Sequence, residues 1–237
     1  MIDVAANLAR IRERLAAACS RAGRSEADVE LVAVSKRIPL TRVADACRAG
    51  QVVLGENRIQ DAVPRQGEFR ELLAADGLDP DLPRWHFIGS LQKNKARKAA
   101  GAFELIHGVD SADLALRLDR IAGELGVRQP ILLQVNVSGE ESKHGLTPDT
   151  ARSAAAELAA TANVDLQGLM TMARAGADEA ELHSTFAALR TLSETLRADT
   201  GLALPHLSMG MSGDFEAAVA EGATLVRIGS AIFGPRD

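Results

Sequence analysis

The sequence predicts an α/β fold, namely a single (β/α)8 barrel of the TIM type with one additional helix at its amino end. Two observations predict it. Short apolar segments rich in β-branched residues, typical of buried parallel strands, alternate with segments of helical periodicity along the chain. Eight such units fit within 237 residues, so residues 1–237 are expected to form one barrel domain. An open doubly wound sheet is the alternative that the same alternation allows.

The predicted strands are the short apolar segments. The first is an unbroken apolar run that ends on Ser35 and Lys36. A strand buried on both faces cannot easily carry a charge in its middle, so the lysine is expected at the carboxyl end of this strand. In chain order, the strands are expected at residues 31–36, 52–57, 85–89, 104–109, 131–137, 166–172, 207–211 and 225–228.

The predicted helices follow from apolar residues at three- and four-residue spacing and from residues that favour helix ends. Pro39 favours a first helical turn, Ser111 and Thr147 are favourable caps, and Gly23 and Gly50 end the helices before them. In chain order, the helices are expected at residues 4–21, 40–49, 59–75, 92–100, 112–125, 148–160, 178–200 and 215–221.

Composition limits the classes of function. The chain has 27 basic and 32 acidic side chains, a net charge of −5, so no basic surface indicates nucleic acid or an anionic membrane as a partner. The amino-terminal segment carries charges at short intervals and lacks the apolar core of a signal peptide or a membrane span, which indicates a cytoplasmic protein. Cys19 and Cys47 lie far apart in helical patterns and are expected to be two buried thiols rather than a disulfide.

In a TIM barrel, functional residues lie at the carboxyl ends of the strands and in the loops that follow. Among the segments at these ends, Asn57 follows the second strand and the polar segment 136–139 follows the fifth. The loops after strands seven and eight commonly bind a phosphate, and here they carry Ser212, Gly229 and Ser230. The two serines could equally be ordinary helix caps, and Asp214 with Glu216 could satisfy the nearby helix end without a ligand.

Two cationic residues add to this pattern. Arg227 lies within the eighth strand, where alternation turns it either into the barrel mouth or outward to a carboxylate. Lys36 could extend its amine into water, or it could lose its proton in a desolvated barrel mouth and form a Schiff base. A lysine, two phosphate loops and an inward arginine together describe a site for pyridoxal 5′-phosphate (PLP). An aldolase-type enzyme acting on a sugar phosphate is an alternative for the same loops and lysine.

The histidines and the main basic run carry weaker signals. His86 and His107 fall on predicted strands and are as consistent with hydrogen-bonded core residues as with a functional role. His144, His183 and His206 show no metal-ligand spacing, so no metal site is expected. The basic run 93–98 is most simply a solvated helix face.

Several segments of the chain resemble a known family. These are VAVSKRIP, GENRIQDA, WHFIGSLQKNKARK, NVSGEESKHGL, GLMTMA and, most specifically, LSMGMSGDFEAAVAEGATLVRIGSAIFG. In this order they resemble the pyridoxal phosphate homeostasis protein family (YggS/PROSC-like). The resemblance implies a barrel like the amino-terminal domain of alanine racemase, without the second domain of that enzyme. It also implies that PLP is held on Lys36.

The same resemblance implies roles for the other candidate residues. Ser212, Gly229 and Ser230 would hold the phosphate, and Ser230 stands where many relatives have threonine. Arg227 would face the pyridine nitrogen. The residues expected to line the ring are Asn57 and Met209, with His86 and Asn136 as second-rank candidates.

Two features favour a carrier of cofactor over a catalyst. An arginine facing the ring nitrogen disfavours protonation of that nitrogen, which weakens the ring as an electron sink. Racemisation needs two bases on opposite faces of the substrate, and the tyrosine that alanine racemase uses as one of them cannot exist in a chain with no tyrosine. We therefore expect a PLP homeostasis protein that buffers or delivers cofactor, without robust catalytic turnover. A PLP-dependent amino acid racemase is the alternative; the expected partners are PLP and apo PLP-dependent enzymes, and the expected state is a monomer.

Overall fold

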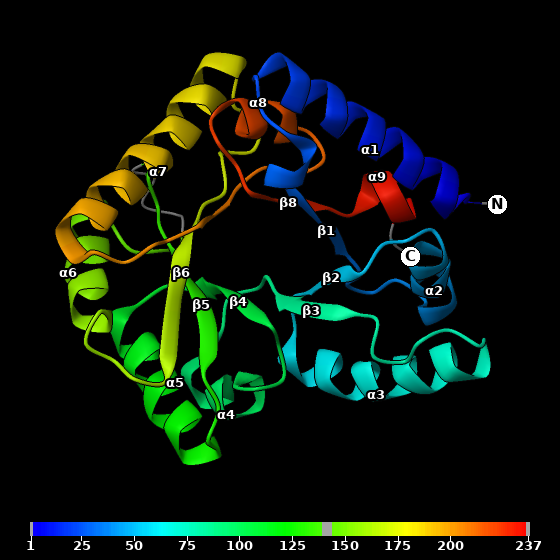
Figure 1. Cartoon of the computed structure of the whole chain (residues 1–237), viewed down its shortest axis with the longest axis horizontal. Helices are drawn as coiled ribbons and strands as arrows, with labels where there is room; N and C mark the ends of the chain where they lie inside the picture. The colour runs from blue at the N-terminus through cyan, green and yellow to red at the C-terminus, as the bar shows by residue number, and fades with distance from the viewer. Residues whose placement is uncertain (1, 139–143, 236–237) are drawn as a thin grey trace.

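The computed structural model describes residues 2–138 and 144–235 and contains a closed barrel of eight parallel strands (Figure 1). The strands follow one another around the barrel in chain order, and the last pairs with the first to close it. The predicted barrel is confirmed, and the open sheet is excluded. The strands are β1 Glu30–Val34, β2 Val53–Glu56, β3 Arg84–Phe87, β4 Leu105–Val109, β5 Gln129–Gln134, β6 Val164–Met170, β7 His206–Ser208 and β8 Leu225–Ile228.

Helices connect successive strands and lie outside the barrel, as Figure 1 shows. They are α1 Val4–Arg21, α2 Leu40–Arg48, α3 Ile59–Ala75, α4 Ala96–Ala99, α5 Ala112–Leu125, α6 Pro148–Leu158, α7 Glu179–Thr200, α8 Phe215–Ala220 and α9 Ser230–Phe233, with two short 3-10 helices, η1 Glu26–Asp28 and η2 Lys93–Lys95. Among the described residues, none of these helices has the length and apolar character needed to cross a membrane.

Helix α1 precedes the barrel and covers the junction between its first and last units. The Asp3 side chain caps the helix by accepting the Ala6 N–H at 2.9 Å. The buried face of α1 packs against α2, which follows β1, and against α8 and α9, which flank β8 (Figure 1). Cys19 of α1 and Cys47 of α2 are both buried, free thiols, as predicted. The additional helix of the prediction thus joins the two ends of the barrel sequence.

Buried apolar side chains form two groups, one on each side of the barrel wall. The larger group lies between the strands and the surrounding helices and includes Leu31 and Ala33. The smaller group lies inside the barrel and includes Val32, which alternates with those two residues along β1. The members of the smaller group are Val32, Val53, Leu105, Leu132, Met170 and Leu225. Because these side chains fill the interior, a ligand can enter only at a barrel mouth.

The strands near the candidate site end earlier than the sequence predicts. β5 ends at Gln134 instead of residue 137, and β7 ends at Ser208 instead of residue 211. After β7 the chain turns at Gly210, whose φ is +94° and where an added Cβ would lie 2.7 Å from the Ala218 Cβ. A tight helix contact therefore ends this strand, and periodicity alone does not reveal it. The predicted helix over 92–100 is shorter, comprising η2 and α4, and α9 follows β8 where no helix was predicted.

Candidate functional site

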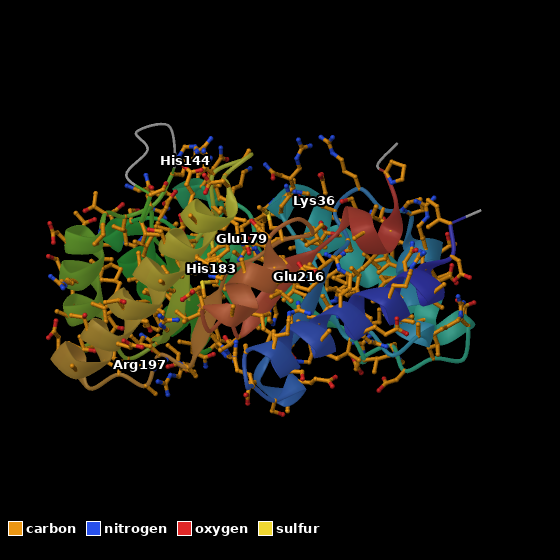
Figure 2. The ribbon with its side chains drawn as sticks, turned by 90° about the horizontal axis from the view of Figure 1, so that it is seen from above. Lys36, His144, Glu179, His183, Arg197 and Glu216 are labelled. Carbon is orange, nitrogen blue, oxygen red and sulfur yellow. The ribbon has the colours of Figure 1, made fainter. Side chains whose placement is uncertain are left out.

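A cavity of about 470 Å³ lies at the carboxyl ends of the strands. This is the end at which TIM barrels carry their active sites. Figure 2 shows Lys36 and His144 toward one side of the molecule and Arg197, near the end of α7, toward the opposite side. The lining residues follow or end β1, β2, β3, β5, β6 and β7: Lys36, Asn57, Ile88, Gly89, Ser90, Gln134, Val135, Asn136, His144, Met170, Thr171, Met172, Ala173, Ala175 and Met211.

Lys36 lies in a tight turn just past the end of β1. The Ile38 N–H donates to the Ser35 carbonyl at 3.0 Å, and Arg37 between them has a φ of +60°. Val34 of β1 pairs with Gly55 of β2, so Lys36 and Asn57 each lie two residues beyond a paired position, and both line the cavity. Parallel pairing thus brings together two predicted site residues from adjacent strands.

A network of hydrogen bonds and one ion pair around the buried Glu56 carboxylate lies next to this turn. The Ser35 hydroxyl donates to Glu56 Oε1 at 2.8 Å, and Arg65 Nε lies 3.7 Å from the same oxygen. Arg65 Nη2 also donates to the Ile38 carbonyl at 2.8 Å. Burial raises the pKa of the Glu56 carboxyl, while the Ser35 hydrogen bond and the Arg65 charge act in the opposite direction. The network therefore connects the turn that carries Lys36 with the end of β2.

Replacing Glu56 with glutamine is expected to change how stability depends on pH. The pKa of Glu56 is raised above its ordinary value of 4.5, so the folded chain holds this proton more tightly than the unfolded chain. In the natural protein, the contribution of Glu56 therefore becomes less favourable as pH rises from 4.5 through the raised pKa. Glu56→Gln keeps an acceptor for Ser35 but has no such titration. Urea unfolding at a series of pH values should show that the free energy of unfolding of the variant increases relative to that of the natural protein as pH rises over this range.

The exposed Glu71→Gln variant, in the same helix as Arg65, is the control for replacing a carboxylate by an amide. A constant difference in unfolding free energy between Glu56→Gln and the natural protein across this pH range would contradict the prediction.

Arg227 of β8 points into the barrel interior, which resolves the two orientations that alternation allowed. Its side chain is buried; Nη1 donates to Ser208 Oγ at 2.6 Å, and Nη2 donates to the Thr171 carbonyl at 3.0 Å. Burial lowers the pKa of Arg227 to about 10, with Asp214 acting in the opposite direction, so the guanidinium stays charged at neutral pH. Thr171 lines the cavity and Arg227 does not, so the cation lies directly behind the cavity wall.

The predicted phosphate residues lie in the loops after β7 and β8. β8 pairs with β1, with Ala33 opposite Ile228, so Gly229 and Ser230 reach the same edge of the barrel as Lys36. An added Cβ at Gly229 would lie 3.3 Å from the Val34 Cβ, which shows how closely the two strand ends approach. None of the three predicted phosphate residues is among the cavity-lining residues.

The helices after β7 and β8 are not capped by Ser212 and Ser230, the alternative role that the sequence allowed for these serines. The N-cap of α8 is Asp214 rather than Ser212, and the N-cap of α9 is Gly229, with Ser230 as the first helical residue. The Asp214 carboxylate accepts the N–H of Met211 within the loop, and Glu216 forms an ion pair with Arg14 of α1 at 2.6 Å. Both acidic residues are therefore engaged with the protein, while neither serine acts as a cap.

Met209 and Met211 have different environments. Met209 follows the short strand β7, donates its N–H to the Leu225 carbonyl at 3.1 Å and is completely buried in the larger core group. After the turn at Gly210, Met211 is 38% exposed and lines the cavity. The strand predicted over residues 207–211 includes both methionines, so this difference in burial was not predicted. Contact between Met209 and a bound ring stays a prediction.

The remaining candidates also have defined places. Asn136 lines the cavity, whereas Gly139, at the end of the same expected loop, lies outside the described residues. His86 and His107 are buried inside the barrel and hydrogen-bonded to each other, which fits their interpretation as core residues. In the basic run, Lys93 pairs with Asp113 at 2.5 Å, and Arg97 pairs with Glu124.

Two polar residues of the cavity, Gln134 and His144, were not predicted as site residues. Gln134 ends β5 and donates to the His144 carbonyl at 3.0 Å, which holds His144 at the cavity. Gln134 belongs to none of the segments that resemble the family, whereas His144 lies within the segment NVSGEESKHGL. Among residues 2–138 and 144–235, no group of three or more His, Cys, Asp or Glu side chains could hold a metal ion.

The residues present fit a phosphorylated aldehyde such as PLP. Lys36 supplies a primary amine at the cavity, and Arg227 supplies a buried positive charge behind its wall. Ser230 is exposed, and Ser212 and Gly229 are partly buried, so the segments after β7 and β8 present hydroxyl groups and glycine backbone near the surface. This is the chemistry that an aldehyde, an aromatic nitrogen and a phosphate require.

Comparison with known proteins agrees with this fold. The family described as alanine racemase, N-terminal domain, matches residues 6–237. An alanine racemase from Clostridium difficile, in complex with cycloserine, superposes with a TM-score of 0.72 at 15% identity, over 98% of this chain and 59% of that chain. That likeness concerns the fold alone. The chain is therefore a barrel of the alanine racemase N-terminal domain class.

More similar relatives define the family. The pyridoxal phosphate homeostasis protein of Pseudomonas aeruginosa is 43% identical over 240 residues, which cover 100% of this chain and 97% of the relative. PipY of Synechococcus elongatus PCC7942, in a structure with PLP bound, has a TM-score of 0.84 at 40% identity, over 98% of this chain and 100% of that chain. The chain belongs to the pyridoxal phosphate homeostasis protein family.

Proposed function

We propose that this protein binds PLP reversibly and serves PLP homeostasis by buffering the cofactor or delivering it to apo PLP-dependent enzymes, with an indirect effect on amino and keto acid metabolism. PLP is held as a Schiff base on Lys36. The chain acts in the cytoplasm as a monomer of one barrel domain. Family membership and the bound PLP in PipY support the choice of cofactor.

The observation that carries the proposal is the position of Lys36 at the cavity, with charged Arg227 behind the cavity wall. Only the neutral form of an amine can attack an aldehyde. The amine nitrogen then forms a C=N bond to the aldehyde carbon, with loss of water. Because hydrolysis reverses this bond, such a site can release its ligand.

The other residues hold and orient the ligand. Asn57 and Asn136 present amide groups at the cavity. In the loops after β7 and β8, Ser212, Gly229 and Ser230 offer hydroxyl and N–H donors to a phosphate. Met172 and Met211 are exposed and line the cavity, and flexible thioether side chains suit a mouth through which a ligand passes. Bound PLP supplies an electrophilic carbonyl and an electron-withdrawing ring.

Amino acid racemisation is the second candidate function, and one observation favours it. Among the described lining residues, Lys36 and His144 carry the ionisable side chains, so His144 is the candidate for the second base that a racemase needs. Charged Arg227 argues against high activity, because an arginine facing the ring nitrogen disfavours protonation of that nitrogen and so weakens the ring as an electron sink.

Titration of the purified chain with PLP tests the main proposal. An absorbance band distinct from free PLP should grow to one equivalent, and borohydride reduction followed by peptide mass spectrometry should locate the adduct on Lys36. The loaded protein should then reactivate an apo PLP-dependent enzyme. Absence of saturable PLP binding would refute the proposal.

Exchange of the α-hydrogen of amino acids in deuterium oxide tests the racemase. The expected rate equals that of free PLP across a panel of amino acids. Exchange well above this rate, lost in His144→Gln, would favour the racemase over the carrier.

A further inference from the structure

A chain of buried polar side chains runs across the barrel interior from Arg227. Arg227 Nη1 lies 2.6 Å from Ser208 Oγ, which lies 2.8 Å from His107 Nδ1. His107 Nε2 lies 3.0 Å from His86 Nδ1. The four side chains are buried and come from β8, β7, β4 and β3. A continuous polar path of this kind in an otherwise apolar interior is costly unless each member is satisfied.

The partners assign one direction to the chain of hydrogen bonds. Arginine can only donate, so Ser208 Oγ accepts from Arg227 and gives its own proton to His107 Nδ1. Burial lowers the pKa of His107 well below its ordinary value, with His86 and Arg227 acting in the same direction, so the ring is neutral and has one N–H. That N–H is therefore on Nε2 and donates to His86 Nδ1.

The far end of the chain lies beside a carboxylate at the amino ends of the strands. His86 Nε2 is buried, has no hydrogen-bond partner among the described residues and lies 3.9 Å from Glu104 Oε1. Glu104 accepts from Arg84 Nε at 2.9 Å, and Arg84 pairs with Glu30 at 2.7 Å. The His86 ring and the Arg84 hydrogen bond lower the pKa of Glu104 to about 2, so it is ionised at neutral pH. The last N–H of this series of hydrogen bonds, on His86 Nε2, thus faces the negative charge of Glu104.

The reverse direction is less favourable. In that direction, Ser208 Oγ would accept hydrogen bonds from both Arg227 and His107, and its own hydroxyl proton would have no acceptor in this series of hydrogen bonds. The lone pair of His86 Nε2 would then face the negatively charged Glu104 carboxylate. His206, at the start of β7, also faces this end of the barrel, and burial keeps its pKa below the ordinary value. The surroundings therefore favour a neutral His107 whose N–H group points away from Arg227.

We propose that Ser208, His107 and His86 are positioning residues that hold the Arg227 guanidinium in one orientation behind the cavity. The proposal rests on the proposed function, because the oriented charge acts on PLP in the cavity. Among the described residues, the acceptors of Arg227 are Ser208 Oγ and the Thr171 carbonyl, and both are uncharged. No carboxylate of the described residues forms a direct ion pair with the guanidinium, and its remaining donors can be directed toward the ligand.

Ser208→Ala removes the link next to Arg227 and is the principal variant. Ser193→Ala is the matched control, because Ser193 is also a fully buried serine but its hydroxyl has no hydrogen-bond partner among the described residues. Ser208→Thr keeps the hydroxyl and serves as the conservative variant.

Nitrogen NMR of the protein without PLP tests the series of hydrogen bonds from Arg227 to His86. His107 should show the Nε2–H tautomer, and the Arg227 guanidinium N–H signals should indicate slow rotation. Ser208→Ala should speed that rotation and shift the His107 signals, while Ser193→Ala and Ser208→Thr should change neither. A His107 Nδ1–H tautomer, or an unchanged Arg227 signal in Ser208→Ala, would overturn the proposal.

PLP titration of the same variants tests the effect on the ligand. Ser208→Ala should bind PLP about 10-fold more weakly, the typical effect of losing one charge-assisted hydrogen bond, with a shifted absorbance band. Ser193→Ala and Ser208→Thr should stay within about threefold of the natural protein. Equal affinity in Ser208→Ala overturns the proposal even if the NMR signals move. If the natural protein binds no PLP, the proposed function fails, and the NMR result alone then decides whether the chain positions Arg227.

Discussion

Lys36→Ala is expected to abolish the covalent absorbance band of bound PLP and the borohydride-trapped adduct. The amine of Lys36 is the nucleophile that the proposal places at the cavity, and alanine has no atom that could replace it. The remaining contacts, from the loops after β7 and β8 and from the asparagines at the cavity, still bind PLP noncovalently. We expect affinity to fall by about 100-fold, equivalent to about 2.7 kcal/mol. Equilibrium dialysis measures the residual binding, and mass spectrometry after reduction measures the covalent fraction.

Lys98→Ala is the matched control, because Lys98 is an exposed lysine of α4 and is not among the cavity-lining residues. It should keep both the absorbance band and the affinity. An adduct of equal yield in Lys36→Ala would show that another lysine holds the cofactor, and the assignment of Lys36 would be wrong while PLP binding itself stood.

Gly168→Ala is expected to destabilise the barrel by at least about 3 kcal/mol. Gly168 has a φ of +151°, and an added Cβ would lie 1.9 Å from the His206 carbonyl oxygen. Gly168 lies in β6 where the pairing with β5 shifts register, and it pairs with His206 of β7. An alanine therefore suffers both backbone strain and a clash with main-chain atoms that cannot move without opening the β6–β7 ladder. Urea unfolding followed by circular dichroism measures the loss.

Gly67→Ala provides the comparison for the same chemical change. Gly67 lies within α3, and an added Cβ would have no heavy atom within 4 Å. Alanine favours a helix interior over glycine, so this variant should gain up to about 1 kcal/mol. Unfolding midpoints that are equal for Gly168→Ala and the natural protein would show that β6 adopts another conformation at this position.

Much of the fold follows from local patterns in the chain. Runs such as residues 31–34 are apolar on both faces, because each strand packs against the barrel interior on one side and helices on the other. Ser111 and Thr147 cap α5 and α6 as their positions predict, because an N-cap interaction is local to one turn. Eight repeats of strand and helix then leave few topologies. The pairing of β8 with β1 decides between the closed barrel and the open sheet.

The ends of the elements were less predictable. The seventh strand was predicted to reach residue 211, whereas the close packing of α8 on Gly210 ends it at Ser208. A local sequence pattern does not show how closely Gly210 and α8 pack in space. The consequence for the site is large, because it buries Met209 and brings Met211 to the cavity.

For the site, too, the sequence placed some residues and the tertiary structure decided the contacts of others. Sequence alone was enough to put Lys36 at the end of the first strand, Asn57 at the end of the second and Ser212, Gly229 and Ser230 in the last two loops, because strand ends in a parallel barrel share one edge. Only the tertiary structure could turn Arg227 inward and connect it through Ser208 and His107 to His86. The hydrogen bond between Ser208 of β7 and His107 of β4 crosses the barrel between residues 101 positions apart in the chain, so closure of the barrel, and no local pattern, decides that these side chains meet.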